Sequence, residues 1–288
     1  MGDGLDLDRH GDHAGGKLTE QHVELAGGRV AYRRRGDGPP LVLLHGAFAD
    51  SRDWLPQLDG LSDEFTVVAW DAPGCGGSFD PPEDFGLAGY ADCLAELIDG
   101  LGLAHPHVCG LSFGGGLAIE LVSRHPGLPR SLVLASAYAG WAGSLGREEA
   151  ERRRAEFLRN ADRPLEEVVR EFSTTLFTDS VPDELVDETI DIMIGATRAA
   201  GMRAMGNAFA DADLRDALPT IDIPTLLIYG DADQRSPVSP VGEDLHAGIP
   251  GSKLVVFEGP GHVVNLEAPE RFNDEVRSFL RGLDAAQP

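Results

Sequence analysis

The serine of Gly110-Leu111-Ser112-Phe113-Gly114 is the residue whose surroundings most strongly indicate nucleophilic chemistry. The pentapeptide follows an apolar run and precedes a helix-like stretch, which is typical of a serine held in a sharp strand-to-helix turn. Small neighbours are needed in such a turn because bulkier residues would clash with it. The N-terminus of the following helix also offers unpaired N–H groups to an oxyanion forming at Ser112. The pattern therefore predicts a nucleophile rather than an ordinary glycine-rich connection.

A histidine and an aspartate in later loops complete the set of groups that such a serine needs. An attacking serine requires a base, and the base requires an orienting acid. His262 follows the last apolar run of the chain, and both Asp231 and Asp233 follow the run before it. The order Ser112, Asp233, His262 matches the order expected of an open α/β sheet with such a serine turn, and the carboxyl ends of its strands allow the three loops to converge. We favour Asp233 because Asp231, directly after the strand-ending glycine, is expected to cap the turn.

A fourth loop, His45-Gly46-Ala47-Phe48, is predicted to supply an oxyanion donor. Its glycine allows the chain to fold over so that backbone N–H groups face Ser112. The N–H groups of Ala47 and Phe113 would form a two-donor oxyanion hole, with Phe48 as the alternative for the first donor. Loss of one such donor typically costs about 3–4 kcal/mol of transition-state stabilisation. His45 is expected to be a structural histidine bonded to backbone.

Short apolar runs alternate with amphipathic stretches along most of the chain, which indicates a mostly parallel sheet with helices on both faces. A hairpin that begins at Val23 is expected to add antiparallel strands at one edge. The expected buried strands span residues 41–45, 66–71, 107–111, 131–136, 225–230 and 253–257, and the clearest helices span 87–101, 113–124 and 269–283.

Two segments depart from this alternation. Residues 140–215 contain helical patterns but no strand-like run, so they are predicted to form a helical cap inserted into a core made of residues 19–139 and 216–288. Residues 1–18 mix Gly, Asp and His without apolar periodicity and are predicted to be a disordered leader. Three early histidines, His10, His13 and His22, are more simply interpreted as solvated than as metal ligands.

The composition excludes several classes of partner. The 288 residues carry a formal charge of −24, and Lys17 and Lys253 are the only lysines. Nucleic acids and anionic membrane surfaces are bound through clustered Lys and Arg side chains. We therefore do not expect either of them as a partner of this acidic chain. No run of about 18 apolar residues predicts a membrane span, and the N-terminus does not have the pattern of a signal peptide.

The cysteine content favours a reducing compartment. Cys75, Cys93 and Cys109 are odd in number and none has metal-ligand spacing, so we expect reduced thiols and a cytoplasmic protein. Cys75 is expected on a solvent-near loop, without a catalytic role. The sequence leaves the oligomeric state, including a homodimer, open.

Taken together, these motifs resemble the α/β-hydrolase superfamily. The matching pieces are H-G-A-F at 45, D-A-P-G-C-G-G-S at 71, G-L-S-F-G-G at 110, G-D-A-D at 230 and G-P-G-H at 259, and the resemblance covers roughly residues 20–285. It implies an α/β-hydrolase fold: an eight-stranded, mostly parallel sheet flanked by helices, with a helical cap inserted after the sixth strand. It also implies that Ser112 is the nucleophile, His262 the base and Asp233 the orienting acid, and that Asp71 is structural.

Departures from other branches of that superfamily narrow the expected chemistry. Serine at 112 differs from the aspartate nucleophile of haloalkane dehalogenases and epoxide hydrolases. H-G-A-F lacks both the H-G-G-G-P-G pattern of many carbon–carbon bond hydrolases and the proline of perhydrolase-like esterases. What remains resembles esterases and lactonases, including enol-lactone hydrolases.

The resulting expectation is a serine hydrolase of a small to medium apolar ester or lactone that needs no metal or organic cofactor. Two alternatives stay open: hydrolysis of a carbon–carbon bond in a β-diketone or vinylogous ketone, and a non-catalytic ligand receptor on the same scaffold. The candidate pocket residues, each of which also fits ordinary packing, are Phe48, Tyr138, Trp141, Phe177 and Met205, together with Phe172, Met193 and Met202. Arg203 or Arg235 would suit a substrate carboxylate, although a solvated arginine is the simpler interpretation.

Overall fold

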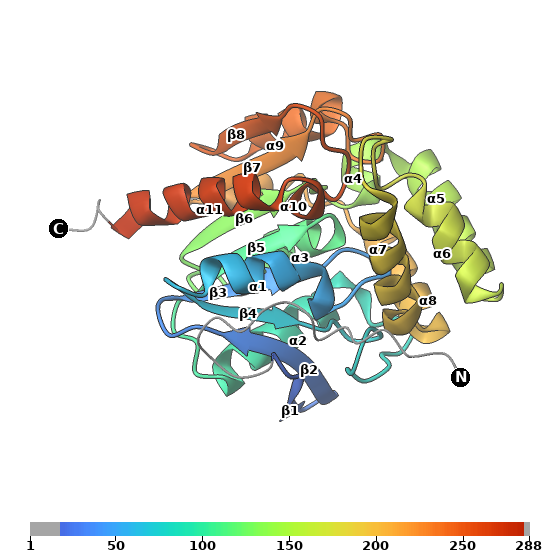
Figure 1. Ribbon diagram of the computed structural model, residues 1–288, viewed down its shortest axis with the longest axis horizontal. Helices are drawn as coiled ribbons and strands as arrows, with labels where there is room; N and C mark the ends of the chain where they lie inside the picture. Colours follow the sequence, from blue (N-terminus) through green and yellow to red (C-terminus); the bar gives the residue numbers. More distant parts are fainter. Residues whose placement is uncertain (1–17, 285–288) are drawn as a thin grey trace.

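An eight-stranded sheet lies at the centre of the computed structural model, which describes residues 18–284 (Figure 1). The predicted leader, with His10 and His13, lies outside the described residues except for Leu18. The spatial order of the strands is β1-β2-β4-β3-β5-β6-β7-β8. The strands are β1 (Gln21–Leu25), β2 (Gly28–Arg35), β3 (Pro40–Leu44), β4 (Thr66–Trp70), β5 (His107–Leu111), β6 (Ser131–Ala135), β7 (Thr225–Gly230) and β8 (Lys253–Phe257).

The pairing of the strands confirms the predicted sheet. β1 and β2 form an antiparallel hairpin, and β2 also pairs antiparallel with β4. All the pairs from β4 to β8 are parallel. Every residue of β4, β5, β6 and β7 is buried, which is why these strands appear in the sequence as continuous apolar runs rather than as alternating ones.

Helices from distant parts of the chain pack against this sheet. α1 (Leu55–Leu61) contacts α11 (Pro269–Asp284), while α2 (Gly86–Gly100) contacts α3 (Phe113–Arg124). The apolar stripe that predicted α2 is buried as expected, including Tyr90, Leu94 and Ile98. Two shorter helices, α9 (Glu243–Gly248) and α10 (Val264–Glu267), accompany β7 and β8.

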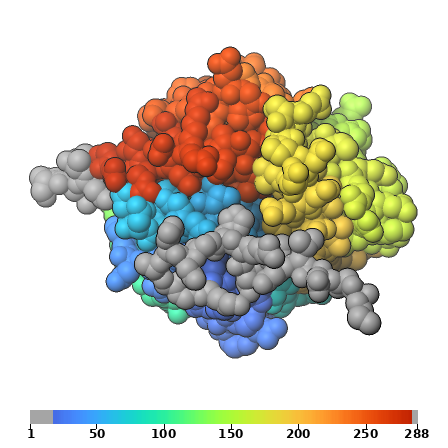
Figure 2. Space-filling view, viewed as in Figure 1, coloured from blue at the N-terminus to red at the C-terminus, as the bar shows by residue number. Residues whose placement is uncertain are grey.

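Five helices follow β6 and precede β7, and we call them the helical insertion. They are α4 (Trp141–Leu145), α5 (Arg147–Asn160), α6 (Leu165–Ser173), α7 (Asp183–Ala196) and α8 (Ala199–Asp211). α5 to α8 stand together on one side of the molecule, and in the space-filling view they form one mass beside the C-terminal part of the chain (Figures 1 and 2). The insertion is tied to the core by Arg52, whose Nη2 donates to the carbonyl of Ile192, and by Arg198, which donates to the carbonyls of Gly76 and Ser78.

Two glycines allow the start of α8 to touch the loop after β4. A Cβ on Gly201 would lie 2.1 Å from the carbonyl oxygen of Gly74, far inside van der Waals contact. We expect Gly201→Ala to lower the free energy of unfolding by about 1–3 kcal/mol, because backbone must move to admit the methyl group. Gly282→Ala is the matched control, since a Cβ there meets no heavy atom within 4 Å. On a helix this change should raise stability by up to about 1 kcal/mol. Equal effects of the two substitutions in urea denaturation would contradict the close approach.

The three cysteines are free and buried. The expectation that Cys75 lies near solvent is wrong, because the residue is 3% exposed and its backbone forms an isolated β-bridge with Thr197 of the insertion. Sequence alone did not reveal that the insertion covers this loop. Burial raises the pKa of all three thiols, that of Cys93 to about 12, so none is a reactive thiolate at neutral pH.

Residues 18–284 contain neither a candidate membrane span nor a candidate metal cluster. None of the helices there combines the length and the apolar character needed to cross a bilayer. Within the same residues, no group of three or more His, Cys, Asp or Glu side chains is arranged to hold a metal ion.

Candidate active site

Ser112 occupies the sharp turn between β5 and α3. Its backbone angles, φ 53° and ψ −111°, are strained for a residue that carries a side chain. The turn is possible because glycines flank it: a Cβ on Gly110 would lie 2.2 Å from the carbonyl oxygen of Gly114, and one on Gly114 would lie 2.2 Å from that of Leu44. The sequence pattern thus has a direct steric cause, and it places Ser112 at the carboxyl end of a central strand.

His262 and Asp233 are hydrogen-bonded to each other. Nδ1 of His262 lies 2.9 Å from Oδ2 of Asp233, and both side chains are almost fully buried. The other carboxylate oxygen, Oδ1, accepts hydrogen bonds from the backbone N–H groups of Arg235 (2.8 Å) and Ser236 (2.9 Å). Burial raises the pKa of Asp233, but the neighbouring His262 and these hydrogen bonds outweigh burial, so the net pKa is below its usual value. Asp233 is therefore a fixed carboxylate that orients the imidazole ring.

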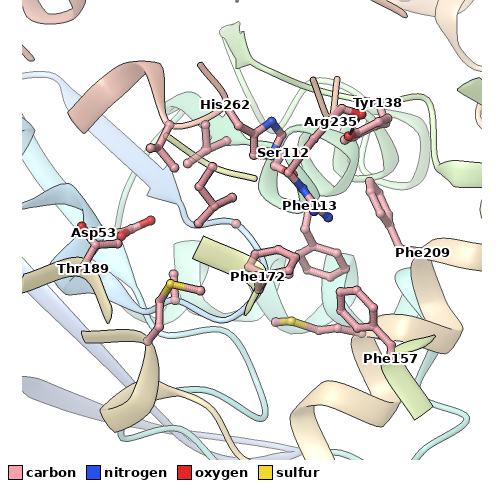
Figure 3. A pocket seen from close by; sticks show the side chains of 18 of the residues that line it. Asp53, Ser112, Phe113, Tyr138, Phe157, Phe172, Thr189, Phe209, Arg235 and His262 are labelled. Carbon is pink, nitrogen blue, oxygen red and sulfur yellow. Dashed lines mark hydrogen bonds between the residues drawn. The ribbon is translucent and has the colours of Figure 1, made fainter. Parts of the chain in front are cut away.

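Ser112 and His262 line the same cavity, although their positions in the sequence are far apart (Figure 3). Ser112 comes from the end of β5, and His262 comes from the loop that follows β8. Asp233, after β7, is hydrogen-bonded to the ring edge of His262 that carries Nδ1. The three loops thus meet at the carboxyl edge of the sheet, where an open parallel sheet places its ligand sites.

Three further polar residues singled out in the sequence bond to backbone groups rather than to Ser112 or His262. They are Asp231, His45 and Asp71. Asp231 accepts a hydrogen bond from the N–H of Gly259 at 2.8 Å, so it holds the turn rather than the histidine. Nδ1 of His45 bonds the carbonyl of Gly46, and its Nε2 accepts from the N–H of Ala72, which confirms the prediction of a structural histidine. Burial lowers the pKa of His45, in keeping with a neutral ring. Asp71 likewise accepts from two backbone N–H groups.

The loop after β3 lies directly against the serine. A Cβ on Gly46 would be 3.6 Å from the Cβ of Ser112, and Gly46, Ala47 and Phe113 all line the cavity. Phe113 is the first residue of α3, so its N–H has no carbonyl partner within that helix. The two residues predicted to hold an oxyanion are therefore on the same cavity wall as Ser112.

The cavity wall is largely aromatic. Six rings line it, from Phe113, Tyr138, Trp141, Phe157, Phe172 and Phe209. Of the predicted pocket residues, Tyr138, Trp141, Phe172, Met193 and Met205 are in this lining. Most of the rings come from the helical insertion and the loop before it, so the insertion closes the cavity over the sheet.

Three of the predicted pocket residues, Phe48, Phe177 and Met202, do not line this cavity. Phe48 has a φ of 63° and packs its ring on Phe157 and Phe172, so it lines a smaller neighbouring cavity together with Met202. Phe177 is half-buried, packs against the core, and lines neither cavity. The positions of Phe48 and Phe177 could not be predicted from the sequence, because each depends on the direction in which a loop side chain points once the insertion packs on the core.

Of the two candidate arginines, Arg235 lines the cavity and Arg203 does not. Arg203 pairs with Asp162 away from the cavity. Arg235 lines the cavity, with its guanidinium 4.2 Å from the ring centre of Phe172 and Nη1 donating to Thr175. Burial lowers the pKa of Arg235. Only Arg235 of this pair is placed to meet a bound molecule.

Asp53 and Thr189 also line the cavity, and the sequence analysis missed both. Asp53 belongs to the 3-10 turn η1 (Ser51–Trp54), and its carboxyl is buried with Oδ1 lacking a hydrogen-bond partner among the described residues. Burial, reinforced by the charge of Asp50 and opposed by that of Arg52, raises the pKa of Asp53 to about 7. The orphaned oxygen is the signal that distinguishes Asp53 from an ordinary structural acid.

This raised pKa predicts a pH-dependent stability. In the unfolded chain Asp53 ionises near pH 4, so between about pH 4 and 7 the folded protein binds the extra proton. Stability due to this group is therefore present at acid pH and is lost as pH rises through that window, by at most about 4 kcal/mol. We expect Asp53→Asn to remove most of that loss when urea unfolding is compared at about pH 5 and pH 8. Asn at the exposed Asp99 is the control and should leave the pH dependence unchanged.

The segment between α6 and α7 is hydrogen-bonded to the loop that carries His262. The N–H of His262 donates to the carbonyl of Leu176 at 2.9 Å. Glu267 accepts from the N–H of Gly261 on one oxygen and from the hydroxyl of Thr178 on the other. The position of the imidazole ring is therefore coupled to the docking of the helical insertion.

Comparisons with known proteins agree with this architecture. The sequence model of a family described as "Alpha/beta hydrolase family" matches residues 41–275. A curated relative, (E)-2-((N-methylformamido)methylene)succinate hydrolase of Acinetobacter baylyi, is 28% identical over 267 residues, covering 91% of this chain and 98% of that protein. From the same organism, 3-oxoadipate enol-lactonase 1 is 28% identical over 250 residues, covering 86% of this chain and 90% of that protein. A solved thermophilic esterase from Thermogutta terrifontis superposes with a TM-score of 0.82 at 28% identity, covering 92% of this chain and 98% of that one.

Proposed function

This chain belongs to the alpha/beta hydrolase family, and from that premise we propose that it is a serine hydrolase of carboxylic esters or lactones. One observation carries the proposal: Ser112 and His262 line one cavity, and the imidazole of His262 is held on its far side by the buried carboxylate of Asp233. The named esterase and enol-lactonase among the similar proteins support the same class of reaction.

The proposed reaction is acyl transfer in two steps. Nε2 of His262 takes the proton of Ser112 as the hydroxyl oxygen attacks the carbonyl carbon of the substrate. The backbone N–H groups of Ala47 and Phe113 stabilise the oxyanion, and the protonated imidazole then gives its proton to the departing alcohol. Water enters, loses a proton to His262, and attacks the acyl-serine; the acid is released as His262 returns that proton to the oxygen of Ser112. Asp233 keeps Nδ1 protonated throughout, which leaves Nε2 free to accept.

The cavity wall favours substrates with a mainly apolar body. Six aromatic rings line the cavity, and Met193 and Met205 add flexible thioethers. Such a wall gains free energy by covering alkyl or aryl groups of small to medium size. Arg235 supplies one cationic group at the cavity wall, whose guanidinium is held over Phe172.

A covalent probe and a substrate panel test this function. We expect a fluorophosphonate probe to form an adduct on the peptide that contains Ser112, detected by mass spectrometry. We also expect p-nitrophenyl esters of short acids to give a burst of nitrophenol, followed by slower turnover. Ser112→Ala should show neither signal.

A substrate panel of esters, lactones and β-diketones also separates the alternative functions. Hydrolysis of β-diketones with no release from esters and lactones would replace acyl transfer by carbon–carbon bond cleavage. Saturable binding of panel compounds without turnover or labelling would indicate a receptor. Equal ester hydrolysis by wild type and Ser112→Ala would remove this serine from the reaction.

A further inference from the structure

The cavity contains a polar end that acyl transfer at Ser112 does not use. Asp53 and Thr189 form it, and Figure 3 shows them on one side of the cavity, with Phe157 and Phe209 on the other and Ser112 between. Asp53 is 4% exposed and Thr189 is 2% exposed. Polar groups this deeply buried are normally paired within the protein.

Both side chains can accept hydrogen bonds, and Asp53 offers acceptors alone, without a donor, once its carboxyl is ionised, above about pH 7. The hydroxyl proton of Thr189 is donated to the carbonyl of Leu185 at 2.8 Å, so its oxygen is left with lone pairs only. Oδ1 of Asp53 has no partner within residues 18–284. A buried acceptor that is left unpaired costs free energy, and a bound molecule that donates a hydrogen bond would recover it.

Two donors near Asp53, those of Arg52 and Asn265, are already engaged elsewhere. The guanidinium of Arg52 is held by the carboxylate of Asp50 and by the carbonyl of Ile192. The side-chain amide of Asn265 donates to the backbone carbonyl of Asp53, which fixes the turn but not its carboxyl. The polar end is therefore rigid and complementary to a donor on a ligand.

We propose that Asp53 and Thr189 form a specificity subsite that binds a hydroxyl or ammonium group on the far part of the substrate, away from the scissile carbonyl. This inference rests on the proposed hydrolase function and deepens it. The substrate is then an ester or lactone with an apolar body and a hydrogen-bond donor remote from the reacting carbon. With Asp53 ionised, a substrate carboxylate at this end is rejected, because it brings a second negative charge and further acceptors to a site that offers acceptors.

Matched ester series test the subsite. The probes are p-nitrophenyl esters of straight-chain acids from hexanoate to decanoate, unsubstituted or carrying a terminal hydroxyl, ammonium or carboxylate. A second series places the donor on the alcohol instead of on the acid. It compares acetate esters of straight-chain alcohols with acetate esters of the matching terminal diols. At one chain length and at about pH 8, where the carboxyl of Asp53 is mostly ionised, we expect the hydroxyl or ammonium compound to exceed its unsubstituted partner in kcat/KM by about tenfold to a hundredfold. Comparison of the hydroxyl and ammonium esters identifies which donor is recognised. The kcat/KM of the carboxylate ester should be below that of the unsubstituted ester.

Variants assign that preference to Asp53. Asp53→Leu should bring the ratio of substituted to unsubstituted ester close to one. Asp53→Asn, which keeps an acceptor without the charge, should lose the ammonium preference and keep part of the hydroxyl preference. Met193→Leu is the control, since Met193 lines the same cavity without a hydrogen-bonding group, and it should keep the wild-type ratio. The ratio cancels effects on folding or on Ser112 that both esters share.

Failure of the subsite can be distinguished from failure of the proposed function. Normal hydrolysis of unsubstituted esters without any preference, or a preference that survives Asp53→Leu, would overturn the subsite alone. Absence of both ester and lactone hydrolysis would overturn the proposed function, and the subsite is then judged by calorimetry on Ser112→Ala. There, a terminal diol should bind more tightly than the alcohol of equal length, and equal binding would overturn the inference.

Discussion

Replacing Ser112 by alanine is expected to lower kcat by roughly a million-fold, which is the loss seen when a serine hydrolase loses its nucleophile. The oxygen that would form the acyl bond disappears, and no neighbouring side chain of the cavity wall replaces it. The hydroxyls of Tyr138 and Thr189 donate to backbone carbonyls, and the carboxyl of Asp53 lies at the polar end of the cavity. Residual hydrolysis should come from the oxyanion donors and substrate binding alone. Steady-state and burst measurements on a p-nitrophenyl ester provide the readout.

A glycine at the same position separates catalysis from folding. The φ of 53° at Ser112 is strained for any residue with a Cβ, so alanine keeps the strain and glycine relieves it. Ser112→Gly should therefore be as inactive as Ser112→Ala, while unfolding at a higher denaturant concentration by an amount equivalent to about 1 kcal/mol. If Ser112→Ala folds normally and loses less than about tenfold of the activity, the nucleophile is a different group.

Most of the fold could be predicted because its strands are buried on both faces. β4, β5, β6 and β7 leave continuous apolar runs in the sequence, and the alternating hairpin β1–β2 marks the half-covered edge. The sequence also placed Ser112, Asp233 and His262 at strand ends, and the parallel strand order brings those ends to one edge. Local pattern and chain order were sufficient there.

The cavity could not be predicted to the same depth, because its wall depends on how the helical insertion docks. Phe48 and Phe177 have the same chemical character as Phe172, yet only Phe172 lines the main cavity. Asp53 lies in a polar stretch that is typical of a solvated turn, and it is buried where η1 packs against α1, α7, β3 and β4. The contacts with the insertion are long-range, and no spacing within either segment encodes them.

Asp233→Asn is expected to lower turnover by about ten-thousand-fold while leaving the protein folded. Oδ1 accepts from the N–H groups of Arg235 and Ser236, so an asparagine side chain must place its carbonyl oxygen there. Its NH₂ group then faces Nδ1 of His262, in the position now held by Oδ2. An imidazole that accepts at Nδ1 carries its proton on Nε2, and that tautomer cannot take the proton of Ser112.

Asp231→Asn is the matched control two residues away, since its carboxylate accepts only the N–H of Gly259 among the described contacts and an amide oxygen can do the same. We expect this variant to stay within a few-fold of wild-type turnover, so the two substitutions should differ by about a thousand-fold or more. Unchanged activity in Asp233→Asn combined with a large loss in Asp231→Asn would exchange the roles of the two aspartates. Both changes remove one negative charge from the same loop, so a difference of this size reports the direct contact between Asp233 and His262.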